Sequence, residues 1–165
     1  MIIIKIIFFK FIFFSFFGYI LECIYSSIID KKITLDRGFL LGPYCPIYGA
    51  CLIIIEKFQK LNNIYLIIIS MIIISLIEYF SSYFLEKFFK KRWWDYSNKK
   101  INLNCRICLE NIIIFSIGTV FIIRNISSFI NENLIINQMN TVLIFFLYLV
   151  FSLDIFLTIK IKNRQ

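Results

Sequence analysis

Residues 64–89 read IYLIIISMIIISLIEYFSSYFLEKFF, an apolar run whose charged residues are Glu78, Glu86 and Lys87. A helix rises about 1.5 Å per residue, so this run is long enough to cross the roughly 30 Å hydrocarbon core of a bilayer and to tilt or protrude. The whole chain of 165 residues is 60% apolar and 17% charged, whereas soluble domains are about 45 to 50% apolar. The run and the composition together predict a membrane protein.

Four further apolar stretches surround this run. Three are clear spans, namely Phe11–Ile29, Ile107–Ile123 and Thr141–Ile159. The fourth, Phe39–Phe58, is interrupted because Pro43 and Pro46 each remove a backbone donor and Gly42 and Gly49 loosen a helix. We interpret the N-terminal run as a span and not as a cleaved signal, because it is longer than a signal core. The prediction is an all-α, polytopic membrane helical bundle of about five transmembrane helices, the second broken by Pro and Gly, in one membrane domain over 1–165.

Five spans place the two termini on opposite faces, and the basic residues predict which face is cytoplasmic. One face holds thirteen of the eighteen Lys and Arg residues: Lys31, Lys32, Arg37, Lys87, Lys90, Lys91, Arg92, Lys99, Lys100, Arg106, Lys160, Lys162 and Arg164. The other five are Lys5, Lys10, Lys57, Lys60 and Arg124. The positive-inside rule then predicts a cell-membrane protein with its N-terminus outside and its C-terminus in the cytoplasm. We attribute the net charge of +8 to topology and anionic lipid, and we expect no nucleic-acid partner.

The stretch RGFLLGPYCPIYG at 37–49 opens the interrupted second span at its cytoplasmic end. Irregular backbone at membrane depth is tolerated only against protein or a water-filled cavity. We therefore expect a polar pocket beside this stretch, open to the cytoplasm.

Two carboxylates lie inside predicted spans. Glu22 and Glu78 are roughly 10 Å and roughly 16 Å from the cytoplasmic ends of their spans. A lone carboxylate at such depth costs several kcal/mol, so it faces a protein interior and finds a partner. Arg37 and Arg106, which begin neighbouring spans on the same face, are the candidate partners. Two interpretations stay open, a functional polar cavity and a structural hydrogen-bonded plug.

Other polar residues extend this picture. Ser82 and Glu86 follow Glu78 at four-residue spacing and form a stripe on one side of a helix. Arg106 and Glu110 are four residues apart and could instead form an ion pair with each other within one helix. Asp154 is a further carboxylate at shallow depth in the last span.

The loop KKRWWDYSNKKINLNCRIC at 90–108 combines aromatic and basic residues. Trp93 and Trp94 suit the headgroup level, where they would anchor the chain on anionic lipid. Alternatively, Trp94, Asp95 and Tyr96 fold against the stretch 37–49 and close the pocket from the cytoplasm.

The five cysteines do not predict a disulfide framework or a metal site. Their number is odd, and Cys23, Cys45 and Cys51 lie in or beside apolar spans. Cys105 and Cys108 have CxxC spacing, but a lone CxxC is a weak signal and the chain contains no His. The sequence has no glycine-rich phosphate loop either. We expect no cofactor and no bound metal.

Four ordered motifs, RGFLLGPYCPIYG, the Glu-Tyr at 78–79, RWWDYS and NLNCRICLE, resemble the bacterial CmpB-like family named for type IV ABC-transporter permeases. A eukaryotic family of small multi-pass membrane proteins is related to it. The similarity covers roughly residues 16–120, and Glu22 fits the acidic position before the RGF motif. One departure is Cys105, which stands where the family usually has Gly. The resemblance implies transport with a separate ATPase subunit, and the segment 87–106 is the candidate coupling surface.

Three functional hypotheses follow. The chain is a transport component whose pocket binds an anionic or amphipathic solute and whose motion comes from an ATPase partner or a homo-oligomer. Alternatively, it is a membrane-embedded enzyme acting on a lipid or lipid-linked substrate, or a lipid-binding scaffold. The predicted pocket residues are Glu22, Arg37, Gly38, Gly42, Pro43, Tyr44, Cys45, Pro46, Tyr48, Gly49, Glu78, Trp94, Asp95, Tyr96, Arg106 and Glu110.

Overall fold

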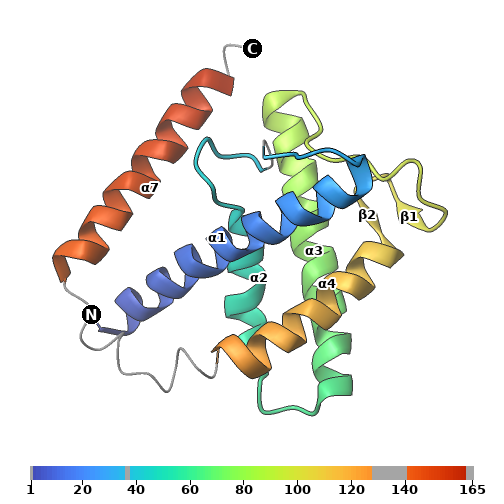
Figure 1. The fold of residues 1–165 in the computed structure, drawn as a ribbon, viewed down its shortest axis with the longest axis horizontal. Coiled ribbons are helices and arrows are strands. Elements are labelled where there is room, and N and C mark those ends of the chain that lie inside the picture. Colours follow the sequence, from blue (N-terminus) through green and yellow to red (C-terminus); the bar gives the residue numbers. More distant parts are fainter. Residues whose placement is uncertain (1, 36–37, 128–140, 163–165) are drawn as a thin grey trace. The chain divides into compact units, whose positions relative to one another are not determined.

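The computed structural model describes residues 2–35, 38–127 and 141–162. Its helices are α1 (Ile2–Asp30), α2 (Pro46–Glu56), α3 (Asn63–Phe89), α4 (Leu109–Ile122), the π-helix η1 (Ile123–Ser127) and α7 (Thr141–Lys162) (Figure 1). Two short strands, β1 (Asn102–Leu103) and β2 (Ile107–Cys108), form a hairpin before α4. The described chain is essentially all-α, which confirms the predicted fold class.

Four of these helices are long and apolar enough to cross a membrane: α1, α3, α4 continued by η1, and α7. Many of their large apolar side chains are exposed, as expected of surfaces that face lipid. The remaining helix, α2, has 11 residues and is therefore about 16 Å long, roughly half of the hydrocarbon core. Residues 38–45 before it are not helical, so the second predicted span is broken where its Gly and Pro residues lie.

The chain forms two compact units, and the first contains α1, the loop after it, the start of α2, and α7. Helix α7 lies beside the N-terminal half of α1 (Figure 1). The ring of Phe8 lies 5.7 Å from that of Tyr148, and the Phe11 and Phe151 rings meet edge to face at 5.6 Å. Lys5 Nζ also donates a 2.7 Å hydrogen bond to Thr141 Oγ1. Aromatic packing thus joins the first and last described helices.

Two glycines let α1 and α2 approach closely in this unit. A Cβ atom added at Gly18 would collide with the side chain of Tyr48, and one at Gly49 would collide with Ser15 Oγ and the Phe11 carbonyl. Small residues permit such backbone proximity between membrane helices. Replacing either glycine would therefore push the two helices apart.

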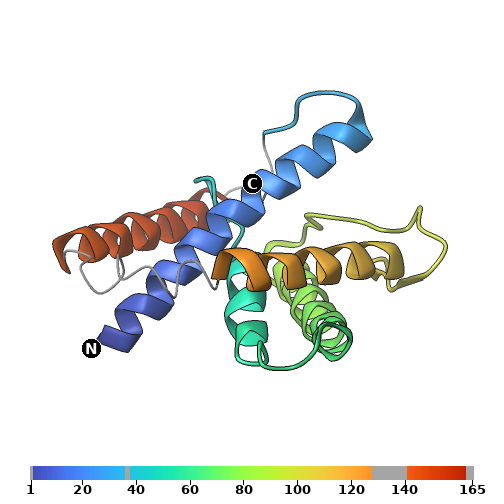
Figure 2. The ribbon, with the colours of Figure 1, turned by 60° about the horizontal axis from the view of Figure 1, so that its bottom comes forward.

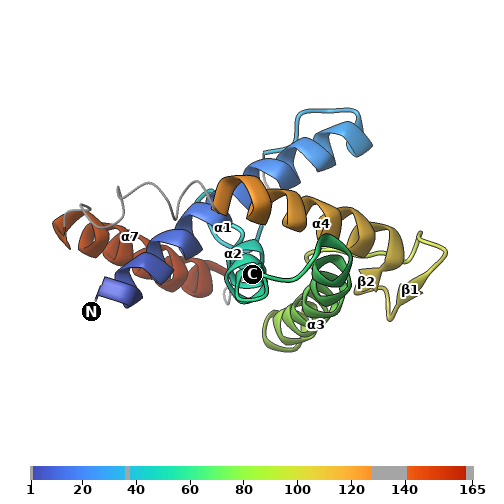
Figure 3. The same cartoon turned by 90° about the horizontal axis from the view of Figure 1, so that it is seen from below.

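The second unit contains the rest of α2, α3, the β-hairpin, α4 and η1. Helices α3 and α4 pack against each other, and the hairpin lies at the N-terminal end of α4 (Figures 2 and 3). The buried face of α3 is a stripe at four-residue spacing: Leu66, Ser70, Ile74, Glu78 and Ser82. Ser70 Oγ donates to the Leu66 carbonyl at 2.7 Å, which satisfies a buried hydroxyl within the helix.

The ends of α3 are capped. Asn62 is the N-cap, and its side-chain oxygen accepts a 3.0 Å hydrogen bond from Tyr65 N. At the other end Lys90 adopts a left-handed conformation with φ 56°, and its N–H donates to the Glu86 carbonyl at 2.9 Å. The caps fix the point at which the basic loop leaves the helix.

Candidate functional site

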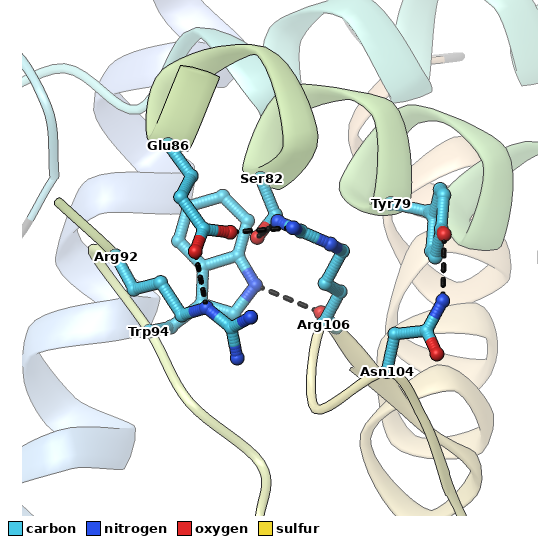
Figure 4. Close-up of polar contacts among 7 residues, drawn as sticks. All are labelled: Tyr79, Ser82, Glu86, Arg92, Trp94, Asn104 and Arg106. Carbon is cyan, nitrogen blue, oxygen red and sulfur yellow. Dashed lines mark hydrogen bonds and ion pairs between the residues drawn. The ribbon is translucent and has the colours of Figure 1, made fainter. Parts of the chain in front are cut away.

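Arg106 is the centre of a polar cluster in the second unit. It lies in the turn of the β-hairpin and reaches back to the last turns of α3, where Nη1 donates to Ser82 Oγ at 3.1 Å and Nη2 forms an ion pair with Glu86 Oε2 (Figure 4). The guanidinium carbon lies 5.9 Å and 5.6 Å from the ring centroids of Tyr79 and Tyr83. Its side chain is 11% exposed. Arg106 is therefore held by hydrogen bonds, an ion pair and cation–π contacts in one orientation.

Glu86 bridges two arginines. Its second oxygen, Oε1, accepts a 3.0 Å bond from Arg92 Nε (Figure 4). The hydrogen bond to this carboxylate raises the pKa of the Arg92 guanidinium above its usual range. Because each carboxylate oxygen already contacts one guanidinium, Glu86 orders both cations.

Three further hydrogen bonds hold the loop after α3, one to the hairpin turn and two to α3. Trp94 Nε1 donates to the Arg106 carbonyl at 2.9 Å, and Asn104 Nδ2 donates to Tyr79 Oη at 2.8 Å. Tyr96 Oη donates to Glu78 Oε1 at 2.7 Å. Asp95 accepts from Ser97 N within the loop. Residues 94–106 thus form a folded surface on α3.

Next to this surface lies an open hollow of about 330 Å³. Its lining residues are Tyr83, Glu86, Lys87, Lys90 and Arg106. Three of them are cations, and the single carboxylate is shared with Arg92. The hollow therefore suits an anion.

Glu110 and Arg106 do not form the ion pair with each other that their four-residue spacing allows. Glu110 Oε2 pairs with Lys99 Nζ at 2.6 Å, whereas Arg106 pairs with Glu86. The reason is that Arg106 belongs to the hairpin turn and not to α4, which begins at Leu109. The four-residue spacing consequently does not run along one helix.

In the first unit, the predicted pocket stretch lies between α1 and α7. Asp154 of α7 accepts the backbone N–H of Leu41 at 3.2 Å and that of Gly42 at 3.0 Å. Thr158, which is fully buried, accepts the Leu41 N–H as well and donates to Asp154 Oδ1. These contacts satisfy the amides of a segment that forms no helix.

The α1 side supplies the other contacts of this stretch. Cys45 N donates to the Ser15 carbonyl at 2.9 Å, and Tyr48 Oη donates to Glu22 Oε2 at 2.5 Å. Glu22 and Glu78 therefore share one feature, a tyrosine hydroxyl donor from a segment outside their own helix.

The other predicted residues of the stretch have these positions. Gly38 has φ 98°, the left-handed region that favours glycine, and Pro43 is exposed. The Tyr44 ring lies 5.8 Å from that of Phe151, Pro46 is the first residue of α2, and Gly49 faces Ser15. Arg37 lies outside the described residues.

The structure adds residues that the predicted pocket omits: Tyr79, Ser82, Glu86, Lys87, Lys90 and Asn104. The four-residue spacing from Glu78 is a signal that identifies Ser82 and Glu86. Tyr79 and Asn104 carry no such signal, because their contact depends on how the hairpin folds onto α3. The five cysteines, all within the described residues, are free thiols.

Comparison with protein families gives one result. The profile described as Putative ABC-transporter type IV matches residues 9–159, which is most of the chain. No curated protein and no solved structure is significantly similar to it. With four helices that are long and apolar enough to cross a bilayer, this chain is a membrane protein and belongs to the family Putative ABC-transporter type IV.

Proposed function

We propose that this chain is the membrane-spanning component of an ABC-type transporter and that it binds an anionic or amphipathic solute in a polar pocket open to the cytoplasm. Membership of the family supports the transport class. The four long apolar helices supply the membrane-spanning part. The binding step is assigned to the hollow at the end of α3.

The observation that carries the proposal is the fixed position of Arg106. A guanidinium has five N–H donors, and the contacts with Ser82 and Glu86 use two of them. Because the group is already oriented and largely desolvated, binding an anion costs little further ordering. Lys87 and Lys90 add charge at the opening of the hollow.

We assign the energy supply for transport to a separate ATPase subunit, because the family is named for ABC transporters and residues 1–165 contain no glycine-rich phosphate loop. The folded basic surface at 94–106 is the proposed contact for a separate ATPase subunit. Its attachment to α3 through Tyr96 and Asn104 would transmit a movement of the partner to the helix. In this arrangement the hollow and the ATPase lie on the cytoplasmic face of the cell membrane, in agreement with the distribution of basic residues.

The test is purification of the tagged chain from its own membranes, followed by native mass spectrometry and a vesicle uptake assay. We expect an ATPase subunit to co-purify and ATP-dependent uptake of anionic solutes to be reduced at least about tenfold in Arg106→Lys, which keeps the charge but loses the planar fork. Lys60→Gln, at the opposite end of α3, is the control and should transport normally.

Two results would contradict the proposal. One is the absence of any ATPase from the native complex together with uptake that is independent of ATP. The other is a lipid product that forms in the absence of ATP and is lost in Glu22→Gln or Glu78→Gln, which would favour a membrane-embedded enzyme.

A further inference from the structure

We propose that the hollow at the end of α3 binds the phosphate group of an anionic lipid, whose acyl chain lies along an aromatic ladder formed by Phe80, Phe84 and Phe88. The inference deepens the proposed function and rests on it, because it names the class of amphipathic anion that the pocket takes. It is carried by three independent features of α3: its length, its charge and its exposed rings.

The first feature is depth. Helix α3 has 27 residues, which at about 1.5 Å per residue is roughly 40 Å, about 10 Å more than a hydrocarbon core. The hollow is lined by Tyr83, Glu86, Lys87 and Lys90 from the last turns of α3 and its cap. When the helix spans the bilayer, these residues lie at the level of the lipid headgroups.

The second feature is charge. Lys87, Lys90 and Arg106 all line the hollow. Glu86 is already engaged by Arg92 and Arg106, one on each oxygen. Within the described part of the chain, Lys87 and Lys90 have no acidic partner. Three cations around one opening suit a phosphate, whose several oxygens accept from a guanidinium fork and from ammonium groups together.

The third feature is the aromatic ladder. Phe80, Phe84 and Phe88 are 50%, 49% and 70% exposed. Their rings stack in succession, with centroids 6.4 Å apart in both pairs. The ladder meets the hollow where the Phe84 ring contacts Tyr83 at 5.5 Å. It thus leads from the cationic opening toward the middle of α3, the direction that an acyl chain takes from a headgroup.

Two tryptophans report directly on this site. The chain contains only Trp93 and Trp94, and Trp94 donates to the Arg106 carbonyl. The full chain would be reconstituted in nanodiscs of phosphatidylcholine that contain either brominated phosphatidic acid or brominated phosphatidylcholine. Bromine quenches indole fluorescence at short range. The mole fraction of brominated lipid that gives half-maximal quenching is measured for each lipid, and the ratio of the two values is the preference for the anionic lipid.

We expect phosphatidic acid to quench at a lower mole fraction than phosphatidylcholine. Lys87→Gln combined with Lys90→Gln should weaken this preference at least about tenfold, since each cation at a membrane surface contributes substantially to binding of anionic lipid. The matched control is Lys57→Gln with Lys60→Gln, which removes the same charge at the other end of α3 and should leave the preference unchanged. Equal effects of the two pairs, or no effect of the first, would overturn the assignment.

Two further experiments test the position of the acyl chain and the identity of the ligand separately. Phe84→Ala should weaken quenching by phosphatidic acid, and unchanged quenching would overturn the acyl-chain position. Inorganic phosphate, added at constant ionic strength, should not displace the lipid. Efficient displacement under these conditions would assign the site to free phosphate. Lipid preference in a protein that has no co-purifying ATPase and whose uptake is independent of ATP would leave this inference standing and contradict the proposed function. An ATPase complex without lipid preference would do the reverse.

Discussion

At the scale of single residues, Asp154 has the most specific role in the first unit. Its carboxylate accepts two backbone N–H groups of the non-helical stretch, from Leu41 and Gly42. Hydrogen bonds to a charged group contribute about 1.5 to 3 kcal/mol. Asp154→Asn replaces one acceptor oxygen by an amide that cannot accept, so we expect faster hydrogen–deuterium exchange at residues 38–45. Tyr148→Phe, which removes only an exposed hydroxyl from the same helix, is the control. Unchanged exchange in Asp154→Asn would show that the contact does not hold the stretch.

At Cys105 we predict a substitution that stabilises the protein. The hairpin turn closes with a 3.0 Å bond from Arg106 N to the Leu103 carbonyl, and its central residues, Asn104 and Cys105, have φ 52° and 58°. Two positive φ values are typical of a type I′ turn, which favours Asn followed by Gly. A non-glycine residue in this region costs roughly 1 kcal/mol. Cys105→Gly, which places at this position the residue that a type I′ turn favours, should therefore raise the free energy of unfolding by about that amount. Thermal unfolding in detergent would measure it, and a destabilised Cys105→Gly protein would contradict the turn geometry.

At the scale of elements, the π-helix η1 is hydrogen-bonded to the end of α2, to the loop between α2 and α3 and to the start of α3. Arg124 donates to the Gln59 carbonyl at 2.5 Å, to the Leu61 carbonyl, and to Asn63 Oδ1 at 2.9 Å. Ser127 also donates to Glu56. A glutamine cannot reach three acceptors, so Arg124→Gln should increase hydrogen–deuterium exchange and proteolysis at residues 57–63 while leaving 94–106 unaffected. The same charge change in Lys60→Gln is the control, and a uniform increase over the whole chain would indicate general unfolding instead.

The elements also show what the sequence can and cannot predict. Hydropathy and length predict the four long helices, because crossing a bilayer requires about 20 apolar residues. The sequence predicts Arg37 and Arg106 as the partners of Glu22 and Glu78. In the structure Arg106 pairs with Glu86 instead, each of the two carboxylates accepts a hydrogen bond from a tyrosine, and Arg37 lies outside the described residues. The donors are Tyr48 and Tyr96, one from a broken helix and one from a loop. Their positions follow from irregular backbone, which apolar patterning does not describe.

At the scale of the whole molecule, α3 makes the membrane topology testable. If this helix of 27 residues crosses the bilayer, the loops at its two ends lie on opposite faces. The basic loop after it should be cytoplasmic by the positive-inside rule, and the proposed ATPase contact requires the same orientation. Lys60 and Ser97 are exposed residues of the two loops. In a chain whose five cysteines are replaced by serine, Lys60→Cys should react with a membrane-impermeant maleimide on intact cells, and Ser97→Cys should react only after permeabilisation. The reverse pattern would place the hollow outside, where a cytoplasmic ATPase could not act on it, whereas labelling of both from one face would mean that α3 does not cross the membrane.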